Sequence, residues 1–386
     1  MVSTLKVLVF SMHNAANPVL YGGAQVAKRN LQLLQYCYGM ENVEICNFLY
    51  PKPEGKVAEH IVVFKRSEPK WDALLAALQG YKIMYPNDMP KILQMVEQVK
   101  PDVIFFDGSV YGKLAKKLHN SGICMIAFFH NVQHDYTWEK VKHQGPAYLP
   151  SFWAARYNEK LVAQYADIIL ALNDRDKRRI EMLYGRNIDM LLPIAAEDRF
   201  EEEKLIEYTD VNRLLFCGSD FPPNLDAVQW FIKDVLPLLP GFALDIVGYK
   251  FENRRKELEQ DNVRVIGTVE RLDDYMYRYP AVIMPIRYGA GMKVKTGEAM
   301  MFGRTIFATD EALEGYEVEG VEGIFSCNTA QEFAKSIGDF FSQKPICKFQ
   351  PAVRKLFLDK YEAENQKKLF ADFLTSRGLD KPNEKD

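Results

Sequence analysis

The chain has 386 residues, of which 48% are hydrophobic and 26% charged, and its formal net charge is −3. This balance is typical of a globular protein of about two domains, and it excludes long disordered or fibrous segments. Apolar runs such as Ile123–Phe129 are far shorter than the ~20 residues of a membrane-spanning helix, and Met1–Lys6 shows no secretory signal. We therefore expect a cytoplasmic protein.

Cysteines and charges narrow the function classes further. The six cysteines are scattered, with no CxxC pair and no Cys/His cluster, which argues against structural zinc and a disulfide framework. Residues 1–195 carry a formal charge of +5 and the remainder −8. The basic first half could face an anionic acceptor or a membrane surface, or it could reflect ordinary surface variation. No local stretch combines dense basic residues with aromatics, so nucleic acid is not expected as a partner.

The first half alternates short apolar runs with longer amphipathic segments, which predicts an α/β domain over residues 1–195 with a parallel sheet. The expected strands are 5–11, 43–49, 60–64, 103–107, 123–129, 168–172 and 188–193, and the expected helices are 23–36, 73–79, 90–100, 112–120 and 152–166.

An acidic, polar stretch at 196–212 interrupts this alternation of apolar and amphipathic segments and is interpreted as a linker. The same alternation begins again after it. A second doubly wound domain is expected over 213–350, and a long charged helical segment at 351–377 closes the chain. Two such sheets imply a cleft, and ligands of these folds bind outside the carboxyl ends of the strands. The expected strands are 213–218, 244–248, 263–267, 282–285, 305–309 and 323–327, and the expected helices are 224–239, 251–260, 291–302 and 330–341.

Gly22 and Gly23 lie between the first strand and the first helix. Glycines at such a turn let backbone N–H groups approach a phosphate at the start of the helix. A tight turn that needs the conformational freedom of glycine would explain them equally well.

A second candidate site lies in 288–300, after the strand expected at 282–285. Gly291 exposes amide donors at a helix start, and Lys293 and Lys295 add positive charge there. Glu298 lies two helical turns after Gly291 and shares its face, where a carboxylate can accept hydrogen bonds from vicinal sugar hydroxyls. Together these features describe a site for a nucleotide diphosphate and its ribose. The alternative is a solvated helix start with a surface glutamate.

His130 follows the strand expected at 123–129. At a strand end an imidazole can transfer a proton or bind a sugar hydroxyl, or it can simply cap the strand. His13, at the end of the first strand, has the same ambiguity. Asp174-Arg175-Asp176 has the spacing of a metal-binding D-x-D, but acidic residues that cap a helix start explain it better, so no metal is expected.

These segments resemble the GT-B glycosyltransferases of family 4, a large retaining group. The resemblance is carried by 214–231, by the strand and loop at 263–270, and by the sugar-nucleotide signature at 291–303; Gly22-Gly23 and His130-Asn131 match the family's N-terminal positions. It implies two Rossmann-like domains facing across a cleft: an acceptor-side domain at 1–195 and a nucleotide-sugar donor domain at 213–350, joined by the linker at 196–212. The C-terminal segment 351–386 would pack its helix back on the first domain and end in a polar tail.

The resemblance also implies residue roles. Glu298 would bind the ribose, Lys295 the diphosphate with Lys293 beside it, and His130 would be the catalytic residue that contacts the transferred sugar. No metal or other cofactor is implied, because lysines and helix N-termini can neutralise the leaving diphosphate. The implied donor-binding residues are Gly22, Gly23, Gly218, Thr268, Val269, Glu270, Gly291, Met292, Lys293, Lys295 and Glu298.

The expected function is therefore a retaining, metal-independent hexosyltransferase of polysaccharide biosynthesis, which moves a sugar from a nucleotide-diphosphate donor to a glycan, lipid-linked or small acceptor. Its N-terminal domain could contact the inner face of a membrane peripherally. Many members have an acidic residue eight positions before the ribose glutamate, where this chain has Ala290. A sugar-nucleotide epimerase on the same scaffold, or a catalytically silent sugar-nucleotide-binding subunit, is the alternative.

Overall fold

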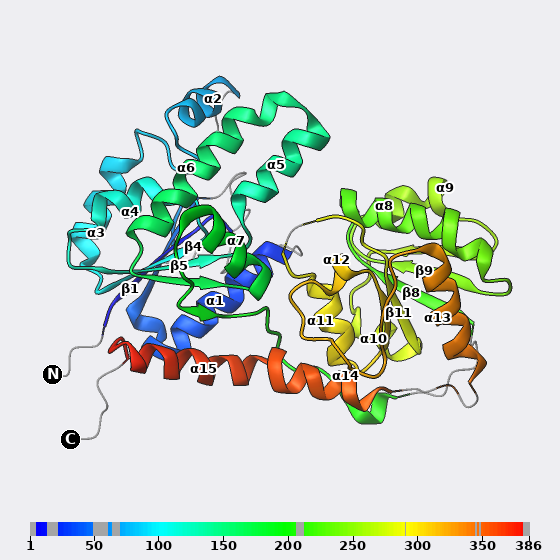
Figure 1. Cartoon of the computed structure of the whole chain (residues 1–386). Coiled ribbons are helices and arrows are strands. Elements are labelled where there is room, and N and C mark those ends of the chain that lie inside the picture. The colour runs from blue at the N-terminus through cyan, green and yellow to red at the C-terminus, as the bar shows by residue number, and fades with distance from the viewer. Residues whose placement is uncertain are drawn as a thin grey trace, which may run out of the picture. The chain divides into compact units, whose positions relative to one another are not determined.

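The computed structural model describes residues 5–13, 22–48, 61–63, 70–205, 212–289, 291–343, 346 and 349–380. The chain forms two compact units, the first made of Met1–Pro193 with Gln366–Asp386 and the second of Ile194–Asn365 (Figure 1). Ala290 lies outside the described residues, as do 206–211 of the expected linker and the tail at 381–386.

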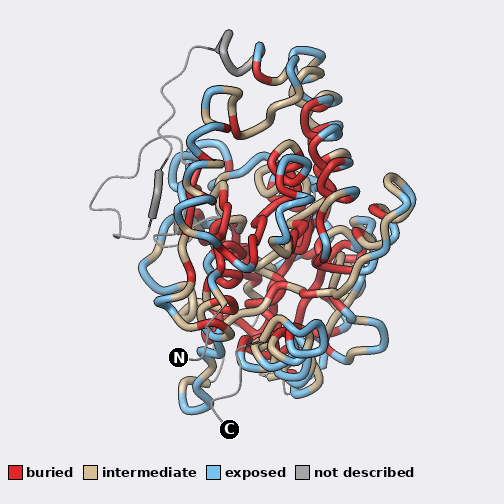
Figure 2. Tube along the Cα trace, turned by 90° about the vertical axis from the view of Figure 1, so that its left-hand side faces the viewer, coloured by how far each residue is buried: buried red, intermediate tan, exposed pale blue. Residues whose placement is uncertain are grey.

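The first unit is built on a seven-stranded parallel sheet with the order β3-β2-β1-β4-β5-β6-β7. Every residue of β1 and β4 is buried, as expected for central strands of a parallel sheet that is covered on both faces. Figure 2 shows buried segments in the interior of the trace and exposed ones mainly at its periphery. The strands are β1 (Val7–Ser11), β2 (Val43–Asn47), β3 (Ile61–Val63), β4 (Val103–Asp107), β5 (Cys124–Phe129), β6 (Ile168–Ala171) and β7 (Met190–Leu191).

The helices of the first unit follow the expected alternation, with one addition. The helix at 133–144 was not expected from the sequence, because its residues QHDYTWEKVKHQ are mostly polar. The helices are α1 (Gly22–Tyr38), α2 (Lys70–Leu78), α3 (Met89–Val99), α4 (Gly112–Leu118), α5 (Gln133–Gln144), α6 (Leu149–Tyr165) and α7 (Asp174–Tyr184), with 3₁₀ turns η1 (Met40–Asn42) and η2 (Pro146–Tyr148).

The second unit repeats this architecture with a six-stranded parallel sheet of order β10-β9-β8-β11-β12-β13. The strands are β8 (Arg213–Cys217), β9 (Ala243–Val247), β10 (Val263–Gly267), β11 (Ala281–Met284), β12 (Thr305–Ala308) and β13 (Ile324–Ser326). The helices are α8 (Pro222–Trp230), α9 (Arg255–Leu258), α10 (Asp273–Arg278), α11 (Val294–Met301), α12 (Asp310–Leu313), α13 (Ala330–Ser342) and α14 (Pro351–Leu356); a π-helix (Phe231–Val235) continues α8, and the 3₁₀ turns are η3 (Glu202–Lys204), η5 (Leu236–Leu238) and η6 (Phe251–Arg254). The short helices α10 and α12 were not expected.

The C-terminal segment is not one continuous helix. After α14, the π-helix η7 (Phe357–Tyr361) ends at Glu362, whose backbone is extended. Glu362 forms an isolated β-bridge with Ala196: the Ala196 N–H donates to the Tyr361 carbonyl at 3.0 Å, and the Ala363 N–H donates to the Ala196 carbonyl at 3.1 Å. The final helix α15 (Ala363–Ser376) follows, and from Gln366 onward the chain belongs to the first unit.

The stretch expected as a linker contributes side chains to the second unit. Phe200 stacks on Phe349 with ring centroids 5.2 Å apart and on Tyr277 at 6.1 Å. The guanidinium of Arg354 lies 4.8 Å from the centre of the Phe200 ring. Phe200 is therefore held in the second unit by aromatic and cation–π contacts.

Each sheet reverses its strand order at one point, between β1 and β4 in the first unit and between β8 and β11 in the second. At such a point the connections leave the sheet in opposite directions, and ligands of doubly wound folds bind there, outside the carboxyl ends of the strands. Ser11 and Asp107 are register partners at the ends of β1 and β4. The functional groups described next follow these strand ends.

Candidate functional site

In the second unit, three neighbouring strands end in glycine. Gly218 follows β8, Gly248 follows β9, and Gly267 closes β10. The Gly218 N–H donates to the Val247 carbonyl at 3.0 Å, and the Gly248 N–H donates to the Gly267 carbonyl at 2.8 Å. A Cβ on Gly248 would lie 1.7 Å from the Gly218 carbonyl oxygen, so only glycine fits. Bare backbone at this edge allows close approach by a ligand. The sequence-based list contained Gly218 and missed Gly248, which stands at the equivalent position after its strand.

The predicted base loop Thr268-Val269-Glu270 follows β10 directly. The Thr268 N–H donates to Oε2 of Glu252 at 3.0 Å, and the Lys250 N–H donates to Oγ1 of Thr268 at 3.1 Å. These bonds anchor the start of the loop to the segment after β9. The side chains of Thr268 and Glu270 are exposed.

The turn before α11 is held by Lys293. Its Nζ donates to the Gly291 carbonyl at 2.9 Å and pairs with Oε1 of Glu311 at 2.5 Å, while the Tyr316 hydroxyl donates to the Lys293 carbonyl at 2.9 Å. Gly291 has a φ of 71°, a conformation that favours glycine. Met292 is buried. Lys293 therefore shapes the turn, rather than presenting an ammonium group that is free of neighbours.

Lys295 and Glu298 form the charged part of α11. Nζ of Lys295 donates to Oε2 of Glu298 at 2.5 Å, and Nη2 of Arg199 lies 3.8 Å from Oε1 of the same carboxylate. Glu298 is buried at 8% exposure, so its charge needs these partners. Arg199 also forms two hydrogen bonds to Asp273, at 3.0 and 3.2 Å. Burial would lower the pKa of Arg199, but Asp273 and Glu298 raise it above its usual value.

Arg199 lies beside Glu298 in this candidate site, and the sequence did not predict it. It lies in the stretch expected as a linker, and no motif marks it. Its position is set by Asp273 at the start of α10, a helix that was not expected. Only the fold brings the two acidic side chains to it.

In the first unit, the buried carboxylate of Asp107 forms hydrogen bonds with side chains at neighbouring strand ends, including His130. Asp107 accepts hydrogen bonds from Ser11 Oγ at 2.6 Å, from Asn30 Nδ2 at 2.7 Å and from His130 Nε2 at 2.7 Å. Burial alone would raise the pKa of Asp107, but the charge and hydrogen bond of His130, with the other two bonds, hold it at about 2. Asp107 is therefore ionised at neutral pH. Since Nε2 of His130 donates to it, Nδ1 carries the lone pair of the neutral ring.

His13 completes this cluster at the end of β1. Its ring centroid lies 5.4 Å from that of His130. A Cβ on Gly23 would lie 2.8 Å from the imidazole of His13, so the glycine at the start of α1 makes room for this ring. Burial and the charge of His130 lower the pKa of His13 to about 4, against the opposite effect of Asp107. The structure thus brings together Gly23, His13 and His130, which the sequence left as separate possibilities.

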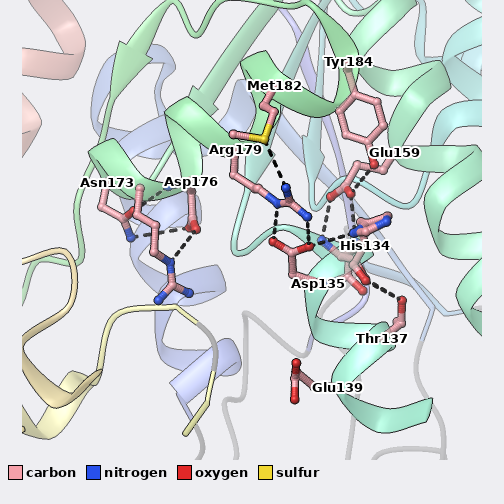
Figure 3. A network of polar contacts seen from close by, with 12 residues as sticks. His134, Asp135, Thr137, Glu139, Glu159, Asn173, Asp176, Arg179, Met182 and Tyr184 are labelled. Carbon is pink, nitrogen blue, oxygen red and sulfur yellow. Dashed lines mark hydrogen bonds and ion pairs between the residues drawn. The ribbon is translucent and has the colours of Figure 1, made fainter. Parts of the chain in front are cut away.

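A second buried carboxylate, Glu159 on α6, orders the segment after His130. Its Oε1 accepts hydrogen bonds from the Gln133 N–H at 2.7 Å and from Ser109 Oγ at 2.9 Å. Its Oε2 accepts hydrogen bonds from the His134 N–H at 3.0 Å and from the Tyr184 hydroxyl at 2.7 Å. Figure 3 shows Glu159 between Tyr184 and the start of α5. The carboxylate satisfies the first amides of α5, which have no partner within the helix.

The D-x-D sequence occupies the start of α7. Asn173 caps this helix, since its side chain accepts from the Asp176 N–H at 2.9 Å, and Asp174 and Asp176 lie in the first turn (Figure 3). Asp176 is buried and lies 3.8 Å from Nε of Arg175. Among the described residues, no group of three or more His, Cys, Asp or Glu side chains could hold a metal ion.

Comparisons with known proteins show which fold and which family model the chain resembles. Residues 211–343 match the family model described as glycosyl transferases group 1. Sucrose-phosphate synthase from Thermosynechococcus elongatus superposes with a TM-score of 0.73 at 13% identity, covering 97% of this chain and 99% of that one. HepE of Anabaena, solved with UDP, gives 0.69 at 14% identity, covering 96% and 100%. The lipopolysaccharide outer core galactosyltransferase WaaB gives 0.66 at 14%, covering 97% and 100%.

The chain therefore has the GT-B fold, which confirms the expected fold class. The residues that match the glycosyl transferases group 1 model all lie in its second unit. No curated protein sequence matches the chain significantly. No helix among the described residues is both long and apolar enough to span a bilayer.

Proposed function

We propose that this protein transfers a hexose, with retention of configuration, from a nucleotide-diphosphate sugar to a glycan, lipid-linked or small acceptor. The observation that carries the proposal is the cluster at the start of α11. Lys295 and Arg199 flank the buried Glu298, in a unit whose strands β8, β9 and β10 end in bare glycine backbone. This arrangement offers cations and amide donors to a diphosphate and a carboxylate to a ribose.

In this proposal Glu298 accepts from the ribose hydroxyls, and Lys295 turns from Glu298 toward the diphosphate. The leaving diphosphate is neutralised by Lys295 and the amides at the start of α11, so transfer needs no metal. Gly22, Gly23, Gly218 and Gly291 offer backbone to the donor, and 268–270 hold the base. His130 acts on the transferred sugar through Nδ1, with Asp107 holding its other nitrogen.

Uridine diphosphate is the first nucleotide to test, because HepE was solved with UDP and with UDP-glucose. We expect UDP to bind the wild type and to bind Glu298→Gln about 10- to 100-fold more weakly, since a lost charged acceptor costs about 1.5–3 kcal/mol. Lys295→Ala should weaken UDP but leave uridine nearly unchanged. Isothermal titration calorimetry measures both ligands, and Glu322→Gln, an exposed substitution in the same unit, serves as the control.

Equal UDP affinity in the wild type and in Glu298→Gln, with both proteins folded, would remove Glu298 from the donor site. Equal loss of UDP and uridine affinity in Lys295→Ala would show that Lys295 does not act on the phosphates. Guanosine, adenosine and cytidine diphosphates, titrated in the same way, identify the base.

A further inference from the structure

The helices α4 and α6 of the first unit pack closely side by side. A Cβ on Gly112, at the start of α4, would lie 2.1 Å from the carbonyl oxygen of Asn158 on α6. The Lys113 N–H donates to Oδ1 of Asn158 at 3.2 Å, which fixes the register of the two helices. Their outward faces therefore form one continuous surface. We call it the α4/α6 surface; it consists of Lys113, Lys116, Lys117, Trp153, Arg156, Tyr157 and Lys160.

The charge of this surface has one sign. Helix α4 contains three lysines and no acidic residue, and the only acidic residue of α6 is the buried Glu159. Lys116, Lys117 and Lys160 are exposed, and none of them forms an ion pair with any described residue. The chain as a whole carries a formal charge of −3, so this concentration of cations is local. It is assembled from helices far apart in the sequence, which is why no local basic stretch reveals it.

Large apolar side chains lie among these cations. Trp153 is 57% exposed and Tyr157 is 43% exposed, one helical turn apart on α6, and the guanidinium of Arg156 lies 5.8 Å from the centre of the Trp153 ring. Exposed residues then recur at the helical spacing 153, 156, 157 and 160. An outward face of alternating aromatic and cationic residues is unusual for a helix that only covers a sheet.

Exposed apolar side chains also occur on α2, which packs beside α6 (Figure 1). Leu75 is 55% exposed and Leu78 is 68% exposed. The residues after α2 touch the α4/α6 surface directly: Nδ2 of Asn158 donates to the Gly80 carbonyl at 2.7 Å, and a Cβ on Gly80 would lie 2.9 Å from the Tyr157 ring. Two exposed leucines thus lie on a helix that packs beside α6.

We propose that the α4/α6 surface docks on an anionic lipid bilayer. Lysine and arginine side chains contact the headgroup phosphates, while Trp153, Tyr157 and the exposed leucines of α2 enter the interfacial layer. A soluble polyanion would be recognised by the cations alone and would leave the exposed tryptophan and leucines without a role. This inference goes beyond the proposed function and does not rest on it, because bilayer binding requires neither donor nor acceptor.

The test is co-sedimentation of the full chain with phosphatidylcholine vesicles, with and without phosphatidylglycerol. We expect binding only to the anionic vesicles, and weaker binding at high salt. Each basic residue near an anionic surface increases binding about fivefold, so Lys116→Glu/Lys117→Glu should weaken it by about tenfold or more. The matched control is Lys233→Glu/Lys335→Glu in the second unit, which changes the net charge equally on exposed residues.

Trp153→Ala tests the apolar contribution. It should weaken vesicle binding several-fold while leaving the binding of dextran sulfate, a soluble polyanion, unchanged. Circular dichroism confirms that each variant is folded. Equal vesicle binding by the two double variants would overturn the proposal. So would binding to dextran sulfate with none to vesicles, or a dimer in solution that Trp153→Ala dissociates.

Discussion

His130 owes its position to three neighbouring strand ends in the first sheet. It follows β5 directly, Asp107 ends β4, and Ser11 ends β1, so parallel pairing alone brings the three side chains to one edge. The ionised Asp107 fixes which nitrogen of His130 carries the proton and leaves Nδ1 to accept. A carboxylate that orients an imidazole in this way is a common arrangement in acid–base catalysis.

If His130 acts on the transferred sugar, its removal should raise the activation free energy of transfer more than it weakens nucleotide binding. We expect His130→Ala to reduce kcat by about 100-fold or more and to leave the Kd for the nucleoside diphosphate almost unchanged. His130→Asn should keep part of the activity if the role is hydrogen bonding, and none if a proton is transferred. Turnover, calorimetry and melting temperature are measured on one preparation. A lowered melting temperature with normal kcat would mean that His130 only caps its strand.

The buried Glu159 is expected to make the free energy of unfolding depend on pH. Burial raises its pKa from 4.5 to about 7, against the hydrogen bonds from His134, Tyr184, Gln133 and Ser109, which lower it. Through this group the folded state holds more protons than the unfolded state between these values, so the contribution of Glu159 to the free energy of unfolding falls as pH rises from about 4.5 through 7. The full effect of this group is about 3 kcal/mol.

Urea unfolding at several pH values checks this expectation. Relative to the wild type, the free energy of unfolding of Glu159→Gln should increase as pH rises between pH ~5 and ~7, because glutamine does not titrate while His13, whose pKa is lowered to about 4, still contributes a rise. Glu97→Gln on α3, an exposed substitution, should reproduce the wild-type dependence. An unchanged slope in Glu159→Gln would show that another group causes the dependence.

At the residue scale, local motifs could be predicted and their partners could not. Gly291, Lys295 and Glu298 belong to one short stretch, so their grouping follows from helix geometry. Arg199 joins Glu298 from a segment about a hundred residues earlier, and Asp107 reaches His130 through strand pairing. Neither contact can be predicted from the spacing of residues along the sequence.

At the scale of elements, helix α13 illustrates what the sequence specifies well. Its apolar positions recur at helical spacing, and Thr329 and Glu332 form a reciprocal capping box at its start. The expected range 330–341 agrees with the observed Ala330–Ser342. Helix α5 shows the opposite case: its start is stabilised by Glu159 from α6. That stabilisation depends on tertiary packing, and the polar sequence of α5 gives no sign of it.

The packing of α4 on α6 allows a matched pair of substitutions. Gly112→Ala places a methyl group 2.1 Å from the Asn158 carbonyl and 2.7 Å from Cβ of Leu161, so the helices must separate. We expect a loss of about 1–3 kcal/mol in the free energy of unfolding. Gly338→Ala, inside α13, meets no atom within 4 Å and should stabilise by about 0.5–1 kcal/mol. Chemical denaturation of both variants measures the difference, and similar effects at the two sites would contradict the close packing.

At the scale of the whole molecule, the same fold occurs twice along the chain. Alternating apolar and amphipathic segments predict both sheets, because parallel strands buried on two faces are nearly continuous apolar runs. The segment at 351–377 was expected to be a single helix and is interrupted at Glu362, where the chain bridges to Ala196. This interruption depends on a contact between distant segments, which helical periodicity does not reveal.

The central claim is that the molecule transfers a sugar out of a nucleotide-diphosphate donor. The most direct measurement is proton NMR of UDP-sugar, GDP-sugar and ADP-sugar donors incubated with the protein and a panel of glycan and small acceptors. We predict release of the nucleoside diphosphate, a new anomeric signal on the acceptor that keeps the donor's configuration, and loss of both in Glu298→Gln. A donor that is epimerised with its nucleotide still attached, or bound and recovered unchanged with every acceptor, would contradict the account.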